Sequence, residues 1–195
     1  PGDRVRILDL PDATWNLADQ PRPLQPPDML RAPPPGLEHD GHCMVGPIAV
    51  HGAKPGMTLE VILHRLRTAD WGWTCAGGFP YRVNQLLDLE DQPPRWIAWE
   101  IDDEVAREPG GFAVPVSPFL GVIGLPPSTP GLHSSVPPRY CGGNLDCREL
   151  TQGSSLFLPI PVTGALLSLG DGHAAQGDGE VAGVAIECPM TEVEI

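Results

Sequence analysis

Five side chains that can do acid–base or metal chemistry fall close together near the end of the sequence: Asp171, His173, Gln176, Asp178 and Glu180. Glycines alternate with them, so the chain from Gly170 to Glu180 can fold tightly and turn its polar groups inward. Carboxylates this close repel one another unless a cation or a polar substrate gathers them. The alternative is a glycine-rich turn whose acids are simply solvated.

Apolar runs flank this segment and predict how it is held. Residues 165–169 precede it, and the β-branched and small residues 181–186 follow it, which indicates a strand, a loop and a second strand. Strands on both sides would hold the loop rigidly, as a catalytic site requires.

A second group of candidates lies about thirty residues earlier, where Gly142 and Gly143 precede Asn144 and Asp146. Alone, this pattern is also typical of a plain turn. It nevertheless offers an amide, a carboxylate and two backbone N–H groups. If it folds beside the first segment, Asp146 joins Asp171, His173 and Glu180 around one point.

Histidines and a cysteine offer further candidates. His39 and His42 have the H-x-x-H spacing, and His42 is the better candidate ligand because ordered structure is expected directly after it. Cys141 is a possible nucleophile or a small buried hydrophobic residue. No H-E-x-x-H, G-x-S-x-G or P-loop pattern occurs.

Composition narrows the class of protein. The 195 residues suit a single domain spanning 1–195, and the net charge of −13 argues against nucleic acid and anionic membranes as partners. Five cysteines without C-x-x-C spacing indicate a reducing, cytoplasmic location rather than a disulfide framework. The chain begins abruptly, so we expect an N-terminal part to be missing.

The secondary structure expected from the sequence is mainly β, with one short helix at 83–89. Residues 11–42 form a proline-rich irregular excursion. Residues 46–63 predict a strand, a turn and a strand, arranged as a hairpin or a corner. We therefore expect an antiparallel β-sandwich or barrel-like core with few short helices. The remaining expected strands cover 5–8, 71–75, 96–101, 112–116, 119–125, 156–162, 181–186 and 191–195.

Several stretches resemble the acetamidase/formamidase family, in the right order and over roughly residues 40–195. The resemblance is most specific in the last of them. They are Gly46-Pro47-Ile48, Val50-His51-Gly52-Ala53-Lys54-Pro55-Gly56, Gly121-Val122-Ile123-Gly124, Gly142-Gly143-Asn144-Leu145-Asp146, Leu158-Pro159-Ile160-Pro161-Val162, Gly164-Ala165-Leu166, 170–180 and Ala185-Ile186-Glu187.

The resemblance implies hydrolysis of small linear amides to ammonia and the acid, a mainly β fold with a small α/β portion, and a divalent metal in some members. It also implies that this chain is short at both ends. The expected substrate is a small neutral amide, and we expect a homo-oligomer.

On this basis we expect a cation held by Asp146, Asp171 and His173, with His42 as a further ligand. Zinc suits a His/carboxylate shell, whereas calcium suits oxygens from Asp171, Asp178 and Glu180.

For the reaction itself, Glu180 is the expected general base, with Asp178 as a further catalytic candidate. Asn144, Gly142 and Gly143 would stabilise the oxyanion, and Gln176 would orient the substrate.

Three alternatives remain open at this stage. The chain could be a non-catalytic β module that binds a metal or a small ligand. It could be an amidase with Cys141 as nucleophile. It could have a structural role at a subunit interface, which would account for its tryptophans.

Overall fold

The computed structural model describes residues 2–19, 41–78 and 82–195. Most of the proline-rich excursion expected at 11–42, with His39, therefore lies outside the described residues. The fold is mainly β, with antiparallel sheets and a short helix, α2 (Arg82–Leu86), close to where the sequence predicts one. No closed barrel forms among the described residues. None of the described helices is long and apolar enough to span a membrane.

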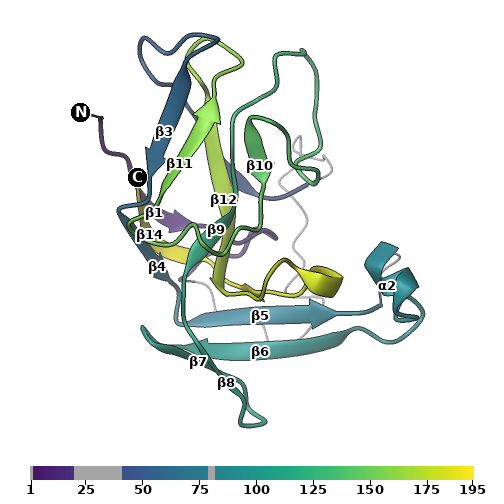
Figure 1. Cartoon of the computed structure of the whole chain (residues 1–195). Helices are drawn as coiled ribbons and strands as arrows, with labels where there is room; N and C mark the ends of the chain where they lie inside the picture. The colour runs from purple at the N-terminus through teal and green to yellow at the C-terminus, as the bar shows by residue number, and fades with distance from the viewer. Residues whose placement is uncertain (1, 20–40, 79–81) are drawn as a thin grey trace.

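The central sheet carries most of the molecule. It runs in the order β10 (Gly142–Asn144), β9 (Phe119–Gly124), β12 (Leu167–Ala175), β13 (Ile186–Glu187), β5 (Trp71–Ala76), β6 (Arg95–Ile101), β7 (Val105–Arg107) and β8 (Ala113–Pro115). A further strand, β2 (Met44–Ile48), pairs with β12. Figure 1 shows β5 and β6 as the long ribbon at the bottom, with α2 beyond its right-hand end.

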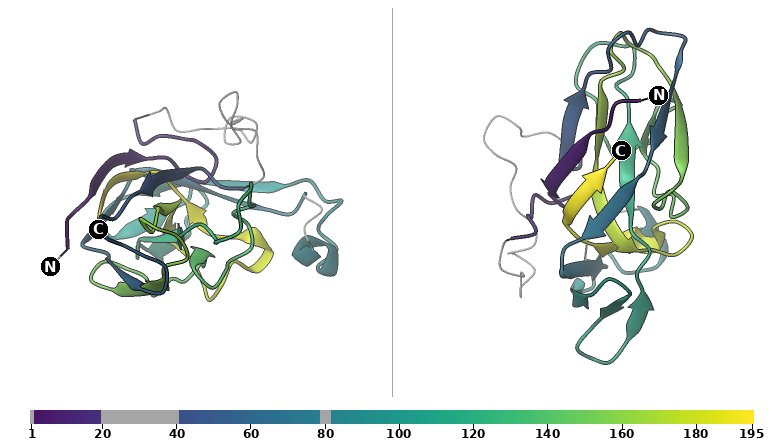
Figure 2. Two further views of the ribbon diagram at one scale, coloured as in Figure 1. Left: turned by 90° about the horizontal axis from the view of Figure 1, so that it is seen from above. Right: turned by 90° about the vertical axis from the view of Figure 1, so that its left-hand side faces the viewer.

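Two smaller sheets complete the described fold. One pairs β1 (Arg6–Leu10) and β4 (Arg65–Thr68) with β14 (Met190–Glu194), and the other pairs β3 (Thr58–Ile62) with β11 (Ser155–Pro159). Both views of Figure 2 show β1 alongside the final strand. Since β3 pairs with β11 and not with β2, the expected block at 46–63 is a corner and not a hairpin.

The strands that matter most for function are buried on both faces. All six residues of β9 are buried, as are eight of the nine in β12. Apolar and small residues make up most of both strands, and strands of this composition suit a fully covered sheet. Polar side chains on β12 are therefore held in a largely dry environment.

The structure corrects two expectations about the C-terminal region. Residues 170–175 belong to β12, so the expected loop begins only at Gln176. Residues 181–185 do not form a strand: a 3₁₀ turn at Val181–Gly183 precedes the short β13, which takes up only Ile186 of the expected strand. The glycines of β12 allow close strand contacts, because a Cβ at Gly170 would collide with the backbone of Cys43 on the adjoining segment.

Candidate metal and catalytic site

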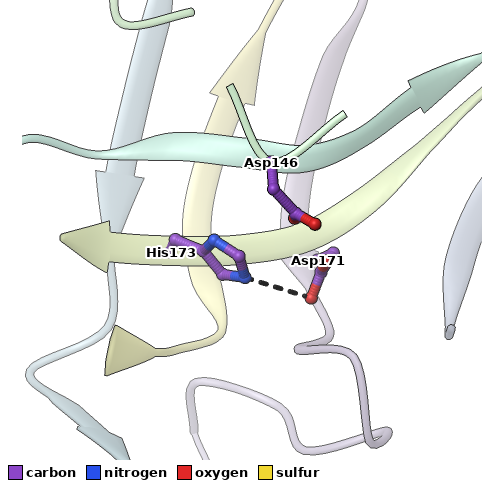
Figure 3. Close-up of side chains that lie close together, drawn as sticks. All are labelled: Asp146, Asp171 and His173. Atoms are coloured by element: carbon purple, nitrogen blue, oxygen red, sulfur yellow. Dashed lines mark ion pairs between the residues drawn. The ribbon is translucent and has the colours of Figure 1, made fainter. Parts of the chain in front are cut away.

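Asp146, Asp171 and His173 converge on one point. Asp171 and His173 lie on β12, and Asp146 lies in the turn that follows β10. One ligand atom from each lies within 4.8 Å of the others. Figure 3 shows the two carboxylates and the imidazole turned toward a common space, with the 3.4 Å contact between His173 Nε2 and Asp171 Oδ1 dashed. Three side chains at this spacing can ligate one divalent cation.

The space for this cluster depends on the absence of a side chain at Gly121 in β9. A Cβ built there would lie 2.8 Å from Asp146 Oδ1 and 3.0 Å from His173 Cε1, and it would collide with Asp171. The sequence resemblance includes Gly121, but sequence reasoning gave it no role. Any larger residue would displace the ligand atoms themselves.

Gln176 fixes the orientation of the His173 imidazole. Its Nε2 donates a hydrogen bond of 2.9 Å to the carbonyl oxygen of Asp146, which can only accept. Its Oε1 therefore faces Nδ1 of His173, at 3.0 Å, so that Nδ1 must carry the proton. Nε2 of His173 then points into the cluster, buried and without a hydrogen-bond partner. A metal-ligating histidine needs this arrangement of its two nitrogens.

His42 is arranged in a similar way on the other side of Asp171. Its Nδ1 lies 2.8 Å from the hydroxyl of Ser135, which also accepts a 2.7 Å hydrogen bond from the His42 backbone N–H. Its Nε2 lies 4.0 Å from Asp171 Oδ2. Both imidazoles thus turn Nε2 toward the same carboxylate, and His42 lies next to the cluster, although the residues grouped at metal-ligand spacing do not include it.

Glu187 is a functional candidate that sequence reasoning missed. It lies directly opposite His173 across the β12–β13 pair, and its Oε1 is 3.2 Å from His173 Nε2. His173, Glu180 and Glu187 form a second group with metal-ligand spacing. A signal was present in the sequence, since Glu187 is a single acid between the apolar run 184–186 and Cys188. An acid in such a run is rarely buried without a partner.

Glu180 lies at the edge of the cluster, where the 176–180 segment ends. Its Oε1 is 3.8 Å from His173 Nε2, and 23% of its side chain is exposed. Burial is the main cause that raises the pKa of Glu180 to about 7, and the charges of Asp146 and Asp171 add to it. A carboxyl with this pKa can exchange a proton near neutral pH.

The remaining pKa values show how the cluster balances its charge in the metal-free protein. Burial would lower the pKa of His173, but the carboxylates of Glu187 and Asp171 raise it well above its usual value. Burial raises the pKa of Glu187 well above its ordinary range, although His173 opposes the shift. Protons thus supply the positive charge that a bound cation would supply in their place.

The pKa values of Asp146 and Asp171 shift in opposite directions. Burial, followed by the charge of Asp171, raises the pKa of Asp146. For Asp171, burial also opposes ionisation, yet the positive charge of the neighbouring His173 outweighs it and lowers the pKa. Both residues have left-handed backbone angles, with φ of 61° at Asp171 and 44° at Asp146. Such conformations are costly for non-glycine residues and gather at functional sites.

Other sequence-predicted residues lie apart from the cluster. Asp178 is 85% exposed and pairs with Arg148 at 3.0 Å, so the all-oxygen calcium shell with Asp171 and Glu180 is not assembled. The N–H of Gly142 donates to the carbonyl of Arg139 and is not free for an oxyanion, and Gly143 lies opposite Ile123 in the β10–β9 pair.

Asn144 and Cys141 also make contacts that limit the roles expected for them. Asn144 donates to the carbonyl of Val136, while its Oδ1 is buried without a hydrogen-bond partner. Cys141 is fully buried, and its thiol donates to the carbonyl of Leu125. Burial raises the pKa of Cys141, which disfavours the thiolate that a nucleophile would need.

Comparisons with known proteins point to one family. Residues 130–194 match the model of the Acetamidase/Formamidase family, a range that contains Asp146, Asp171, His173, Gln176, Glu180 and Glu187. Over 47 residues the chain is 55% identical to an acetamidase from Mycolicibacterium smegmatis and 51% identical to a formamidase from Methylophilus methylotrophus. Each match covers 24% of this chain and 12% of the relative.

Solved structures extend the similarity to the whole chain. The acetamidase of Bacillus halodurans superposes with a TM-score of 0.75 at 25% identity, over 99% of this chain and 61% of that one. The acetamidase of Yersinia enterocolitica superposes with a TM-score of 0.75 at 28% identity, and the match covers 100% of this chain and 58% of that one. This chain thus spans about three fifths of the solved relatives. The resemblance to the acetamidase/formamidase family is confirmed, by sequence within residues 130–194 and by fold along the chain.

Proposed function

We propose that the protein hydrolyses the C–N bond of small linear amides, releasing ammonia and a carboxylate, with a divalent cation held by Asp146, Asp171 and His173. The observation that carries this proposal is the convergence of these three residues within 4.8 Å, beside a carboxyl with a pKa of about 7. The named relatives, acetamidases and a formamidase, support the choice of substrate class.

The residues present fit a cation. The Nε2 of His173 and Oδ1 of Asp146 are buried and lack hydrogen-bond partners. Gly121 faces them, and a side chain at that position would collide with the cluster. A mixed nitrogen and oxygen donor set favours zinc or a similar ion over calcium. His42 adds a second imidazole, with Nε2 4.0 Å from Asp171. When bound, the ion would supply Lewis acidity to the amide carbonyl and to an attacking water.

Glu180 is the proposed general base. Its carboxylate would take a proton from the attacking water and pass it to the nitrogen that leaves as ammonia. A pKa of about 7 suits both transfers at neutral pH. Its partial exposure, at 23% of the side chain, lets it exchange protons with solvent afterwards.

The rest of the cluster positions these groups. Gln176 holds His173 and the Asp146 main chain together, and we propose this positioning role for it beside the substrate-orienting role expected from sequence. Glu187 lies on β13, directly opposite His173, and its carboxyl contact with Nε2 helps to hold the imidazole in place. Phe119 packs edge-on against the His173 ring, with centroids 5.0 Å apart, and helps to exclude water.

The decisive experiment pairs two carboxyl-to-amide changes in the same segment. Glu180→Gln should abolish ammonia release from formamide and acetamide while metal content stays at the wild-type level. Asp178→Asn is the matched control, because Asp178 is exposed and turned toward Arg148. Wild-type turnover in Glu180→Gln would remove Glu180 from the reaction.

The same cluster could also hold a cation without turning over any substrate, as a non-catalytic β module. Metal binding without ammonia release from either amide would favour that alternative. A Cys141 nucleophile would instead predict that a thiol reagent stops the reaction and that a chelator does not.

Location and assembly are also part of the proposal. Five free cysteines fit a reducing cytoplasm. We retain the homo-oligomer as an expectation, which light scattering after gel filtration would test.

A further inference from the structure

A buried chain of hydrogen bonds joins β6, through β5, to the segment that carries Glu180 and Glu187. Trp99 Nε1, on β6, donates a 2.9 Å hydrogen bond to the hydroxyl oxygen of Thr74 on β5. Because the indole N–H can only donate, the hydrogen of the Thr74 hydroxyl is left for another acceptor. That acceptor is the main-chain carbonyl of Ala185, at 2.5 Å. All three residues are buried.

Ala185 lies in the stretch of chain that connects the two glutamates. At the start of this stretch, the N–H of Gly183 donates to the carbonyl of Glu180 and closes the 3₁₀ turn. At its end, Glu187 pairs with Trp73 of β5. The bond from Thr74 therefore holds the main chain at a point between the turn and β13.

The same face of β5 lets this segment come close. Gly72 and Thr74 are two residues apart on the strand, so they face the same side of the sheet. A Cβ at Gly72 would lie 2.7 Å from the carbonyl oxygen of Glu187. The glycine thus allows the main chain to approach at Glu187, and the Thr74 hydroxyl bonds it at Ala185.

The position of this segment matters for the proposed base. Glu180 Oε1 lies 3.8 Å from His173 Nε2, and Glu187 Oε1 lies 3.2 Å from the same atom. Both carboxyl groups therefore depend on where the main chain between them runs. Asp146 and Asp171 lie on other segments, so a shift of this stretch should affect Glu180 more than the proposed ion ligands.

We propose that Thr74 is a positioning residue for Glu180, and that Trp99 fixes the direction of its hydroxyl. Thr74 acts through the carbonyl of Ala185. A displacement of about 1 Å at a catalytic group can slow a reaction about 100-fold, so a single buried bond that holds the segment can control the rate. This inference rests on the proposed function and adds a positioning residue to it.

The test uses the full chain loaded with zinc. Thr74→Val keeps the branched shape of the side chain and removes the hydroxyl, whereas Thr74→Ser keeps the hydroxyl. Thr191→Val is the matched control, because the Thr191 hydroxyl also bonds main-chain carbonyls, those of Arg67 and Thr68, but in the sheet of β1, β14 and β4. Ammonia release from acetamide gives kcat and KM, and isothermal titration gives the zinc affinity.

We expect Thr74→Val to lower kcat about 10- to 100-fold, while KM and the zinc affinity change by less than about threefold. Thr74→Ser should recover most of kcat, and Thr191→Val should keep all of it. Wild-type kcat in Thr74→Val, or an equal loss in Thr74→Ser or Thr191→Val, would overturn the inference. If Thr74→Val does not fold, Trp99→Phe takes its place, since it removes only the N–H that orients the hydroxyl, and it should lower kcat severalfold.

Amide hydrogen exchange in the metal-free protein tests the positioning role without turnover. Exchange at Cys188, whose N–H bonds the carbonyl of Gly172, should be at least about tenfold faster in Thr74→Val than in the wild type. Exchange at Leu63, equally buried and bonded to the carbonyl of Ser154, should not change. Faster exchange at Cys188 alone, without ammonia release from any variant, would keep the positioning role of Thr74 and reject the hydrolase. Unchanged exchange at Cys188 would overturn the positioning role whatever the turnover.

Discussion

The side-chain oxygen of Gln176 lies 3.0 Å from Nδ1 of His173 and accepts its hydrogen bond. The amide nitrogen of Gln176 is committed to the carbonyl of Asp146, so the direction of the bond to His173 is fixed. One neutral side chain therefore sets both the tautomer of the imidazole and the position of the neighbouring turn. Metal binding at His173 should therefore depend on this pair of residues.

Gln176→Leu should weaken metal binding about 10- to 100-fold, because the His173 ring loses the acceptor that directs Nε2 into the cluster. Isothermal titration with zinc measures the change. Gln85→Leu is the control, since Gln85 is exposed on α2. Unchanged affinity in Gln176→Leu would show that the ring is oriented by other contacts.

Gly121→Ala should disrupt the cluster directly. The added methyl would lie 2.8 Å from Asp146 Oδ1 and would force the ligand atoms apart. We expect loss of stoichiometric metal binding together with a lower free energy of unfolding. Gly177→Ala is the matched control, because a Cβ there meets open space. Full metal occupancy in Gly121→Ala would contradict the proposed position of the ion.

Ser135→Ala should weaken metal binding if His42 is a ligand, because the imidazole loses the hydroxyl bonded to Nδ1. Ser134→Ala serves as the control, since its hydroxyl bonds only the N–H of Val136 among the contacts of the described residues. Equal affinities in the two variants would remove His42 from the ligand set.

The pKa of Glu180 predicts how stability depends on pH in the metal-free protein. Its pKa is raised by burial from 4.5 to about 7, so its contribution to stability is fully present below about pH 4.5 and is lost as pH rises through about 7. Between pH 5 and pH 8 the wild type should lose up to about 3 kcal/mol more unfolding free energy than Glu180→Gln. Urea unfolding at both pH values, with chelator present, measures this difference. Parallel losses in the two proteins would show that Glu180 is not buried as described.

The sequence predicted the residue types of the site better than their local structure. Asp146, Asp171 and His173 were expected to meet, and the structure brings them together. The glycines around Asp171 are typical of a loop, yet here they allow β12 to approach its neighbours, as at Gly170 against Cys43. Local pattern could not distinguish these two uses of glycine, because the choice depends on strands far away in the sequence.

Glu187 and Asp178 also show that local sequence does not reveal which acids reach the site. Glu187 reaches His173 only through the register of β13 on β12, which no local spacing reveals. Asp178 is two residues from Glu180 and has the same chemistry, but its side chain turns outward to Arg148. Side-chain direction at the end of a strand is a tertiary property, and it decides which of these acids can take part in the reaction.

Anomalous diffraction at the zinc absorption edge, from crystals of the full chain grown with zinc, tests the central claim most directly. The account predicts one peak about 2.0–2.2 Å from His173 Nε2 and from carboxylate oxygens of Asp146 and Asp171. A peak bound by Glu180 and Glu187 without Asp146 and Asp171, or no peak at this cluster, would contradict it.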